Sequence, residues 1–299
     1  MAISKRRTIG WVITLSVIVL VLNITMMVVW IVMTSGSREW SILAIGTVAF
    51  TLMMAATTVY VILSIKEMRV SQQQADFISS VTHELKTPLA TLRLYLETLQ
   101  MRDLPAEKRE EFYRVMQREL KRLDDLISHL LEMRRLDDLG PDAEREDVPL
   151  HALIQQCAQR ACAYHEKDPA VVHCDVPPLV LRAPRMALEM IFGNLLDNAL
   201  KYSGDDAQVT VEAHALPGER VLVRITDNGC GIPRSAGRRV FRMFYRGKGD
   251  AARRRPGTGI GLYVVRTAVK MLKGRVSFRP RSDGPGTVFE VTLPGRAVR

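Results

Sequence analysis

The sequence predicts two transmembrane α-helices, an α-helical hairpin and a C-terminal α/β sandwich. Two long apolar runs occupy much of the first 65 residues, and two amphipathic helical patterns follow them. After residue 148, short strand patterns alternate with helical ones, as in a layered α/β domain. The expected segments are an N-terminal stretch at 1–8, spans at 9–33 and 40–65 joined by a loop at 34–39, a hairpin domain at 66–139 and a sandwich domain at 140–299.

The composition narrows the classes of function. The chain has 299 residues and a formal net charge of +10. The basic excess could suggest nucleic acid, but the sequence shows no DNA-reading module, so a surface close to an anionic membrane leaflet is the better explanation. The cysteines form no CxxC pair and no cluster with histidine, which predicts reduced thiols rather than a disulfide framework or a zinc site. They are Cys157, Cys162, Cys174 and Cys230.

The two apolar runs, Ile9–Met33 and Trp40–Ile65, contain no charged residue. Each exceeds the roughly 20 residues that a helix needs to span a bilayer. A cleaved signal peptide would have an apolar core of about 7–15 residues and a small-residue cleavage site. The first run is longer and ends without such a site, so both runs are predicted to span the membrane.

The charges beside the spans predict their orientation. Lys5, Arg6 and Arg7 precede the first span, Lys66 and Arg69 follow the second, and only Arg38 lies between them. The positive-inside rule then places both termini in the cytoplasm of a multi-pass inner-membrane protein. The outer loop is too short to form a sensor domain, so the expected input comes from the bilayer, an accessory membrane protein or the cytoplasm.

Two amphipathic helices are expected after the spans, with a turn at Asp103–Pro105 between them and an end near Asp138. A helical hairpin with one apolar seam cannot bury it alone, whereas two copies form a four-helix bundle. The sequence therefore predicts a homodimer. The seam residues are Phe77, Val81, Leu85, Leu89, Leu92, Leu96 and Leu99 in the first helix and Phe112, Met116, Leu120, Leu123, Ile127, Leu130 and Met133 in the second.

The first of these helices carries the sequence His-Glu-Leu-Lys-Thr-Pro at His83–Pro88. Pro88 removes the backbone hydrogen bond to the carbonyl of Glu84, which predicts a weakened or kinked helix one turn after His83. His83 and Thr87 share a face, and Glu84 adjoins the histidine as a base or orienting group. A lone histidine on a long helix is usually a solvated one, and His129, without such neighbours, is expected to be structural.

The C-terminal part alternates between strand and helix patterns, which predicts a mixed sheet with helices on one face. An irregular segment, ending at Pro256, interrupts this alternation. The expected elements are a strand near 148, helices at 151–164, 184–202 and 261–272, and strands at 170–174, 179–182, 208–214, 220–227, 275–279 and 287–293.

Two segments of this domain suit a nucleotide. Asn194, Asn198 and Lys201 lie on one helix face, and Mg²⁺ prefers oxygen ligands that it shares with phosphate and water. Asp227 ends a strand before Asn-Gly-Cys-Gly; its carboxylate can accept a hydrogen bond from an exocyclic amine, and the glycines let the backbone approach a ligand.

Two further segments complete the candidate site. Phe241–Arg246 offers aromatic rings and a cation. Gly257–Leu262 opens a helix, whose N-terminal amides can hold phosphate. It is neither a Rossmann fingerprint, since no strand runs into it, nor a P-loop, since Gly-Lys-Ser/Thr is missing.

Together, in this order, the segments resemble the H, N, first glycine, F and second glycine boxes of the sensor histidine kinases of two-component systems, over about Val70–Pro294. The resemblance implies a Bergerat-type ATP-binding domain, autophosphorylation of His83 by ATP with Mg²⁺, and transfer of the phosphoryl group to an aspartate of a separate response regulator. It also implies phosphatase activity toward that regulator.

The resemblance further implies a role for each matching residue. His83 is the phosphoacceptor, Glu84 its acid/base partner, and Thr87 positions water in the phosphatase reaction. Asn198 is the Mg²⁺ ligand, and 233–256 forms a lid. The residues implied to bind ATP are Asn194, Asn198, Lys201, Tyr202, Asp227, Gly229, Gly231, Arg246, Gly257, Thr258, Gly259, Gly261 and Leu262.

Two alternatives remain open at this point. One is an ATPase of the same fold that hydrolyses ATP for motion, which would not need the segment around His83. The other is a non-catalytic membrane scaffold that binds nucleotide or a partner kinase, against which the intact catalytic boxes argue. Loss of phosphoryl labelling in His83→Gln distinguishes the kinase from both.

Overall fold

A computed structural model describes residues 2–34, 40–101, 104–139, 143–246 and 257–297. The chain divides into two compact units, Met1–His83 and Glu84–Arg299, and each is described by itself. The predicted loop at 34–39, except for Thr34, and the predicted boundary at 140–142 lie outside the described residues.

The first unit holds α1 (Ala2–Thr34) and the N-terminal part of α2 (Trp40–Met101). Both helices are long and apolar enough to cross a membrane, with mean hydropathy of 2.7 at Thr14–Thr34 and 2.1 in α2. The Trp30 ring lies against Gly46, where a Cβ would overlap it, and is 6.4 Å from the Phe50 ring between centroids. The absence of a side chain at Gly46 therefore lets the two helices approach.

Helix α2 is continuous for 62 residues and passes through Pro88 without ending. The weakening expected from Pro88 therefore does not break the helix, in keeping with the loss of a single backbone hydrogen bond. Helix α3 (Ala106–Leu139) follows, and the carbonyl of Pro105 accepts a hydrogen bond from the amide of Arg109 at 3.1 Å. The predicted helix end near residue 138 is confirmed.

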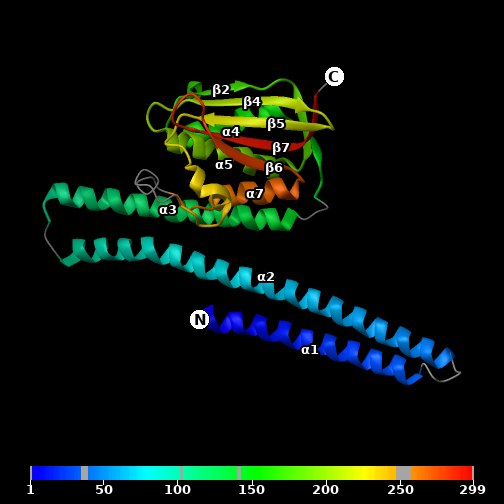
Figure 1. Cartoon of the computed structure of the whole chain (residues 1–299). Helices are drawn as coiled ribbons and strands as arrows, with labels where there is room; N and C mark the ends of the chain where they lie inside the picture. The colour runs from blue at the N-terminus through cyan, green and yellow to red at the C-terminus, as the bar shows by residue number, and fades with distance from the viewer. Residues whose placement is uncertain (1, 35–39, 102–103, 140–142, 247–256, 298–299) are drawn as a thin grey trace. The chain divides into compact units, whose positions relative to one another are not determined.

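Helix α3 uses two apolar faces. Leu126 and Leu136, neither of which belongs to the predicted seam, are buried and join the core of the C-terminal domain. The helix itself lies along α7 (Figure 1). Leu120 and Ile127, which do belong to the seam, are at least half exposed in the single chain. Two other seam residues, Leu130 and Met133, are partly buried and pack against this core. The predicted seam therefore includes only part of the face of α3 that packs inside one chain.

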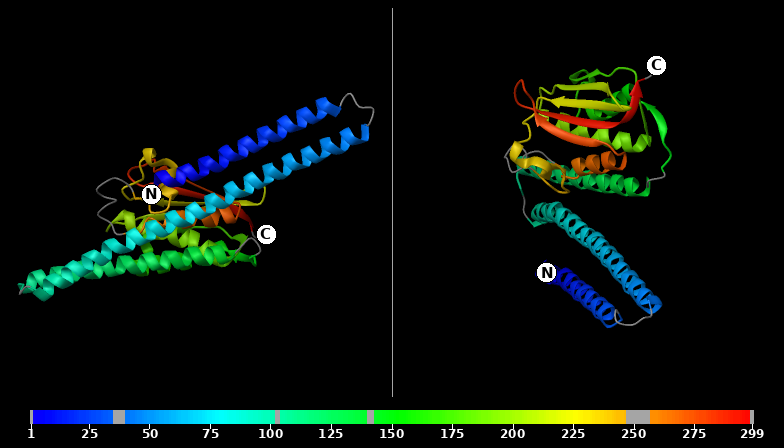
Figure 2. Two further views of the ribbon diagram at one scale, coloured as in Figure 1. Left: turned by 90° about the horizontal axis from the view of Figure 1, so that it is seen from below. Right: turned by 45° about the vertical axis from the view of Figure 1, so that its right-hand side comes forward.

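The C-terminal domain is a mixed sheet with α4, α5 and α7 on one face (Figures 1 and 2). The described strands follow the order β1-β3-β7-β5-β4-β2, with β6 also paired to β7; β2 and β4 run parallel and the other pairs antiparallel. The elements are β1 (Glu146–Pro149), α4 (Leu150–Tyr164), η1 (Pro169–Val171), β2 (Val172–Asp175), β3 (Leu179–Ala183), α5 (Arg185–Ser203), β4 (Val209–Leu216), β5 (Arg220–Asp227), η2 (Arg234–Phe241), α7 (Gly261–Met271), β6 (Arg275–Pro280) and β7 (Thr287–Ala297).

Alternating burial explains why the helices cover one face only. In β5, Val221, Val223 and Ile225 are buried, whereas the residues between them are partly exposed. The predicted elements of this domain are confirmed to within a few residues. In one respect the expectation was incomplete: part of the segment predicted to be irregular forms the 3₁₀ turns of η2.

Candidate active site

Helix α5 positions the two asparagines through its own backbone. Asn194 is buried, and its Nδ2 donates to the carbonyl of Met190 at 2.9 Å and to Oε2 of Glu132 at 3.2 Å. Nδ2 of Asn198 donates to the carbonyl of Asn194 at 2.7 Å. Because each amide nitrogen is used in this way, Oδ1 is the acceptor that each side chain offers. An amide oxygen of this kind suits a hard cation such as Mg²⁺.

Asp227 stands at the end of β5 with a fixed carboxylate. Its Oδ1 accepts hydrogen bonds from the amides of Gly229 at 2.9 Å and Thr287 at 3.2 Å. Burial raises the pKa of Asp227, although these two amide hydrogen bonds act in the opposite direction. Position 229 requires glycine because a Cβ there would lie 2.7 Å from the carbonyl oxygen of Tyr202. The turn therefore packs directly against the end of α5.

The segment before α7 fits closely around the side chains of α5. A Cβ on Gly261, the first residue of α7, would lie 2.6 Å from Oδ1 of Asn194, and one on Gly257 would lie 2.7 Å from Nζ of Lys201. The hydroxyl of buried Thr258 accepts a hydrogen bond from the amide of Ile260 at 3.3 Å. The glycines thus allow two distant parts of the sequence to meet.

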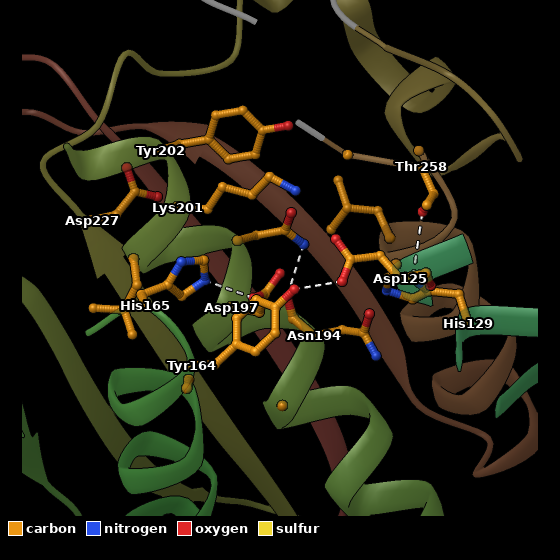
Figure 3. Close-up of a pocket in the computed structure, with 18 of the residues that line it drawn as sticks. Asp125, His129, Tyr164, His165, Asn194, Asp197, Lys201, Tyr202, Asp227 and Thr258 are labelled. Carbon is orange, nitrogen blue, oxygen red and sulfur yellow. Dashed lines mark hydrogen bonds and ion pairs between the residues drawn. The ribbon is translucent and has the colours of Figure 1, made fainter. Parts of the chain in front are cut away.

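These elements surround a pocket of about 1300 Å³. Figure 3 shows Asp227, Lys201 and Tyr202 along one side of it and Thr258 on another. Gly229 does not line the pocket and lies buried behind Asp227. The predicted nucleotide residues that line it are Asn194, Asn198, Lys201, Tyr202, Asp227, Gly231, Arg246, Gly257, Thr258, Gly259, Gly261 and Leu262.

The pocket also has walls that the sequence reading missed. Asp125, His129 and Glu132 of α3 line it. Nδ1 of His129, which was expected to be structural, lies 2.6 Å from the carbonyl oxygen of Asp125 and 3.4 Å from Oγ1 of Thr258. Spacings of four and three place the three residues on one helix face. That pattern alone does not tell which element the face meets.

Residues at the end of α4 form a second missed group. The hydroxyl of Tyr164 donates to Asp125, and Nε2 of His165 lies 2.7 Å from Oδ1 of Asp197 (Figure 3). Burial alone would raise the pKa of Asp197, but the hydrogen bond to His165 and the nearby Lys201 ammonium outweigh it, so the pKa is lowered. Asp197 therefore stays ionised beside Asn198.

The predicted phosphoacceptor segment lies on α2. His83 and Thr87 are exposed, and Glu84 is partly buried. Oε2 of Glu84 accepts a hydrogen bond from a guanidinium nitrogen of Arg122 on α3 at 2.9 Å. The imidazole is therefore exposed to solvent, while the neighbouring carboxylate is held by a second helix.

Comparison with known families assigns both parts of the chain. Residues 184–297 match the "Histidine kinase-, DNA gyrase B-, and HSP90-like ATPase" family, and residues 73–139 match the "His Kinase A (phospho-acceptor) domain". The chain belongs to the sensor histidine kinases of two-component systems. The phosphoacceptor match favours a kinase over an ATPase that shares only the C-terminal fold.

Curated relatives agree with this family. The chain is 29% identical over 240 residues to "Sensor protein kinase WalK" of Staphylococcus aureus, and the match covers 78% of the chain and 56% of that relative. The protein of the same name from strain JH9 is also 29% identical over 240 residues, with 38% of its length covered. The kinase thus spans only about half, or less, of the curated relatives that it matches.

Solved structures share the fold. Histidine kinase ThkA, in a crystal structure of its complex with response regulator protein TrrA, has a TM-score of 0.57 at 18% identity, over 77% of this kinase and 66% of that chain. Acinetobacter baumannii histidine kinase AdeS has a TM-score of 0.53 at 20% identity, over 71% of this kinase and 97% of that chain. At these identities the similarity establishes the fold alone.

Proposed function

We propose that this chain is a protein-histidine kinase that transfers the γ-phosphoryl group of ATP to His83 and then to an aspartate of a separate response regulator. The observation that carries the proposal is the pocket between α5, the Asp227 turn and Gly257–Leu262, in a chain that also contains a phosphoacceptor domain.

The pocket offers a distinct group to each part of ATP. The fixed carboxylate of Asp227 accepts the exocyclic amine of adenine, and Tyr202 flanks the base. Lys201, Arg246 and the amides at the start of α7 meet the phosphates. Oδ1 of Asn198, supported by Asn194, is the proposed ligand of Mg²⁺. When bound, this ion offsets the charge of the phosphates.

The transfer itself needs a nucleophile in line with the leaving group. One nitrogen of the neutral His83 ring forms the bond to the γ-phosphorus, and the bond from phosphorus to the bridging oxygen breaks with ADP as the leaving group. Glu84 holds the N–H of the second ring nitrogen and stabilises the positive charge that develops on the ring. Phosphohistidine then passes its phosphoryl group to the regulator aspartate.

In the phosphatase reaction, Thr87 positions a water molecule that hydrolyses the phosphorylated regulator. It lies one turn beyond His83 on the same helix face. The similarity in fold to ThkA, whose structure holds a response regulator, supports a regulator as the partner.

A homodimer follows from the apolar residues that the single chain leaves exposed. Leu89 and Leu96 of α2 and Leu120 and Ile127 of α3 are each about half exposed or more. All four belong to the predicted seam, and two copies would bury them in a four-helix bundle. Direct binding to nucleic acid is not part of the proposal.

The inner membrane is the proposed location. The two apolar helices support two spans, and the positive charges beside them support cytoplasmic termini. Input then reaches the kinase from the bilayer, an accessory membrane protein or the cytoplasm.

The test uses the full chain in detergent micelles with γ-labelled ATP and Mg²⁺. An acid-labile, base-stable label that is lost in His83→Gln is the expected result. ATP hydrolysis without a label would instead indicate an ATPase. Nucleotide binding with neither activity would indicate a scaffold.

A further inference from the structure

We propose that Arg122 of α3 is a positioning residue that holds the Glu84 carboxylate against the ring of His83 during phosphoryl transfer. The inference rests on the proposed function and extends it to a residue outside the five sequence boxes. Its basis is the contact of 2.9 Å between a guanidinium nitrogen of Arg122 and Oε2 of Glu84.

This ion pair differs from two exposed ion pairs that form within single helices of the hairpin. Arg93–Glu97 and Arg114–Glu110 each lie within one helix, four residues apart, and their side chains are at least half exposed. Arg122 and Glu84 are 38 residues apart in sequence, and their side chains are only 21% and 25% exposed. Because water screens this pair less, it can fix a side chain in one orientation.

The guanidinium is itself anchored. Its second nitrogen lies 3.8 Å from Oε2 of Glu119, one turn earlier on α3. That oxygen is buried and has no hydrogen-bond partner among the described residues, so it depends on the nearby charge of Arg122. A planar guanidinium presents several N–H groups in a rigid fork and stays charged. It can therefore hold Glu84 while Glu119 attracts its other side.

The chemistry of the carboxylate leaves room for the histidine. A carboxylate has about four acceptor positions on its two oxygens. With Oε2 on Arg122, Oε1 remains chemically able to accept the N–H of the neighbouring His83 ring.

During the transfer, one ring nitrogen bonds to the γ-phosphorus and the bond from phosphorus to the bridging oxygen breaks, with its electron pair leaving on ADP. The proton on the second nitrogen is held by Oε1 and is then released to solvent. A carboxylate that is already oriented stabilises the charged ring without reorganisation. The loss of Arg122 should therefore slow the chemical step and leave ATP binding unchanged.

The experiment measures initial rates of His83 labelling against ATP concentration in the full chain. Arg122→Gln should lower kcat about tenfold, with KM for ATP unchanged. This loss is smaller than the roughly 10²–10⁴-fold rate enhancement that a general acid or base itself contributes. Arg122→Lys should recover part of the rate, since an ammonium pairs with the carboxylate without the fork. Arg93→Gln, which removes an exposed ion pair of the same hairpin, is the matched control and should keep the wild-type rate.

A double-mutant cycle then tests the route of the effect. In the Glu84→Gln background, Arg122→Gln should cause no further loss, because the residue acts through the carboxylate. A higher kcat in Arg122→Gln would mean that Arg122 withdraws Glu84 from the reaction, and a changed KM or full additivity would mean that it acts elsewhere; each overturns the proposal. An unlabelled wild-type chain would overturn the proposed function itself.

Discussion

The ammonium group of Lys201 lies against Gly257: a Cβ on residue 257 would be only 2.7 Å from Nζ. The lysine belongs to α5 and the glycine to the segment that leads into α7. Both line the pocket, so two distant sequence boxes form one candidate phosphate subsite. The fit depends on the absence of a side chain at residue 257.

Gly257→Ala should therefore weaken ATP binding by displacing Lys201. A loss of about tenfold in affinity corresponds to about 1.4 kcal/mol. Titration with a fluorescent ATP analogue would measure it. Gly193→Ala is the matched control, because Gly193 also lines the pocket but has open space at its Cβ position. Equal losses in the two variants would contradict the specific contact.

The affinity for ATP should depend on the ionisation of Asp227. Burial raises the pKa of this carboxyl group, and only the carboxylate fully accepts the adenine amine. Affinity should therefore fall as the pH drops through a value above the ordinary range for aspartate, which is about 3.9. The measurement is a pH series of binding curves for ATP and for a triphosphate whose purine lacks the exocyclic amine. A parallel decline for both ligands would contradict the role of Asp227.

The pair of Asp197 and His165 should also make the stability of α5 fall at low pH, although here the pKa of the carboxyl group is shifted downward. The pKa of Asp197 in the folded chain is lowered, because the bond to His165 and the charge of Lys201 outweigh burial. Its contribution to the free energy of unfolding is therefore present above the unfolded pKa of about 3.9 and is lost as pH falls toward the folded value.

Hydrogen exchange of the α5 amides would measure this effect. Asp197→Asn should remove the acid-dependent loss of protection, whereas Asp175→Asn, at an exposed position on β2, should retain it. An unchanged pH dependence in Asp197→Asn would show that another group is responsible.

Cys230 should be the thiol whose rate of alkylation responds to ATP binding. It is exposed and lines the pocket, whereas burial raises the pKa of Cys157 to about 11 and also raises the pKa of Cys162 and Cys174. An alkylating reagent at about pH 8 should modify Cys230 first, since the thiolate is the reactive form. ATP should slow this modification, as measured by mass spectrometry, with Cys230→Ser as the control. Labelling that ATP leaves unchanged would place the nucleotide elsewhere.

All residues predicted to bind nucleotide except Gly229 line one pocket, and local rules explain how the sequence could indicate this. Helical spacing places Asn194, Asn198 and Lys201 on one face, and the glycines mark close approach of the backbone. The contacts of α3 were not predictable in this way. Leu126 is as apolar as the neighbouring seam residue Ile127, and no spacing rule states that the first packs along α7 while the second stays exposed.

The same limit explains Arg122 and His129. Each stands in a charged helical pattern that is usually solvated, and only the tertiary structure shows which helix or loop meets it. Pro88 is a local signal that predicts a weakened or kinked helix, and α2 continues through it as one helix. The weakening itself stays a prediction.

Because α2 is one continuous helix, the angular position of His83 around the helix axis is set by its distance in sequence from the apolar segment. Each residue of an α-helix adds about 100° of rotation and 1.5 Å of length. One residue inserted between the apolar segment and His83 would turn the histidine by about 100° relative to that segment, whereas seven residues would restore nearly the same phase and lengthen the helix by about 10.5 Å. The rate of His83 labelling in such insertion variants should therefore rise and fall with a period of about seven inserted residues. It should not change steadily with the number of residues inserted.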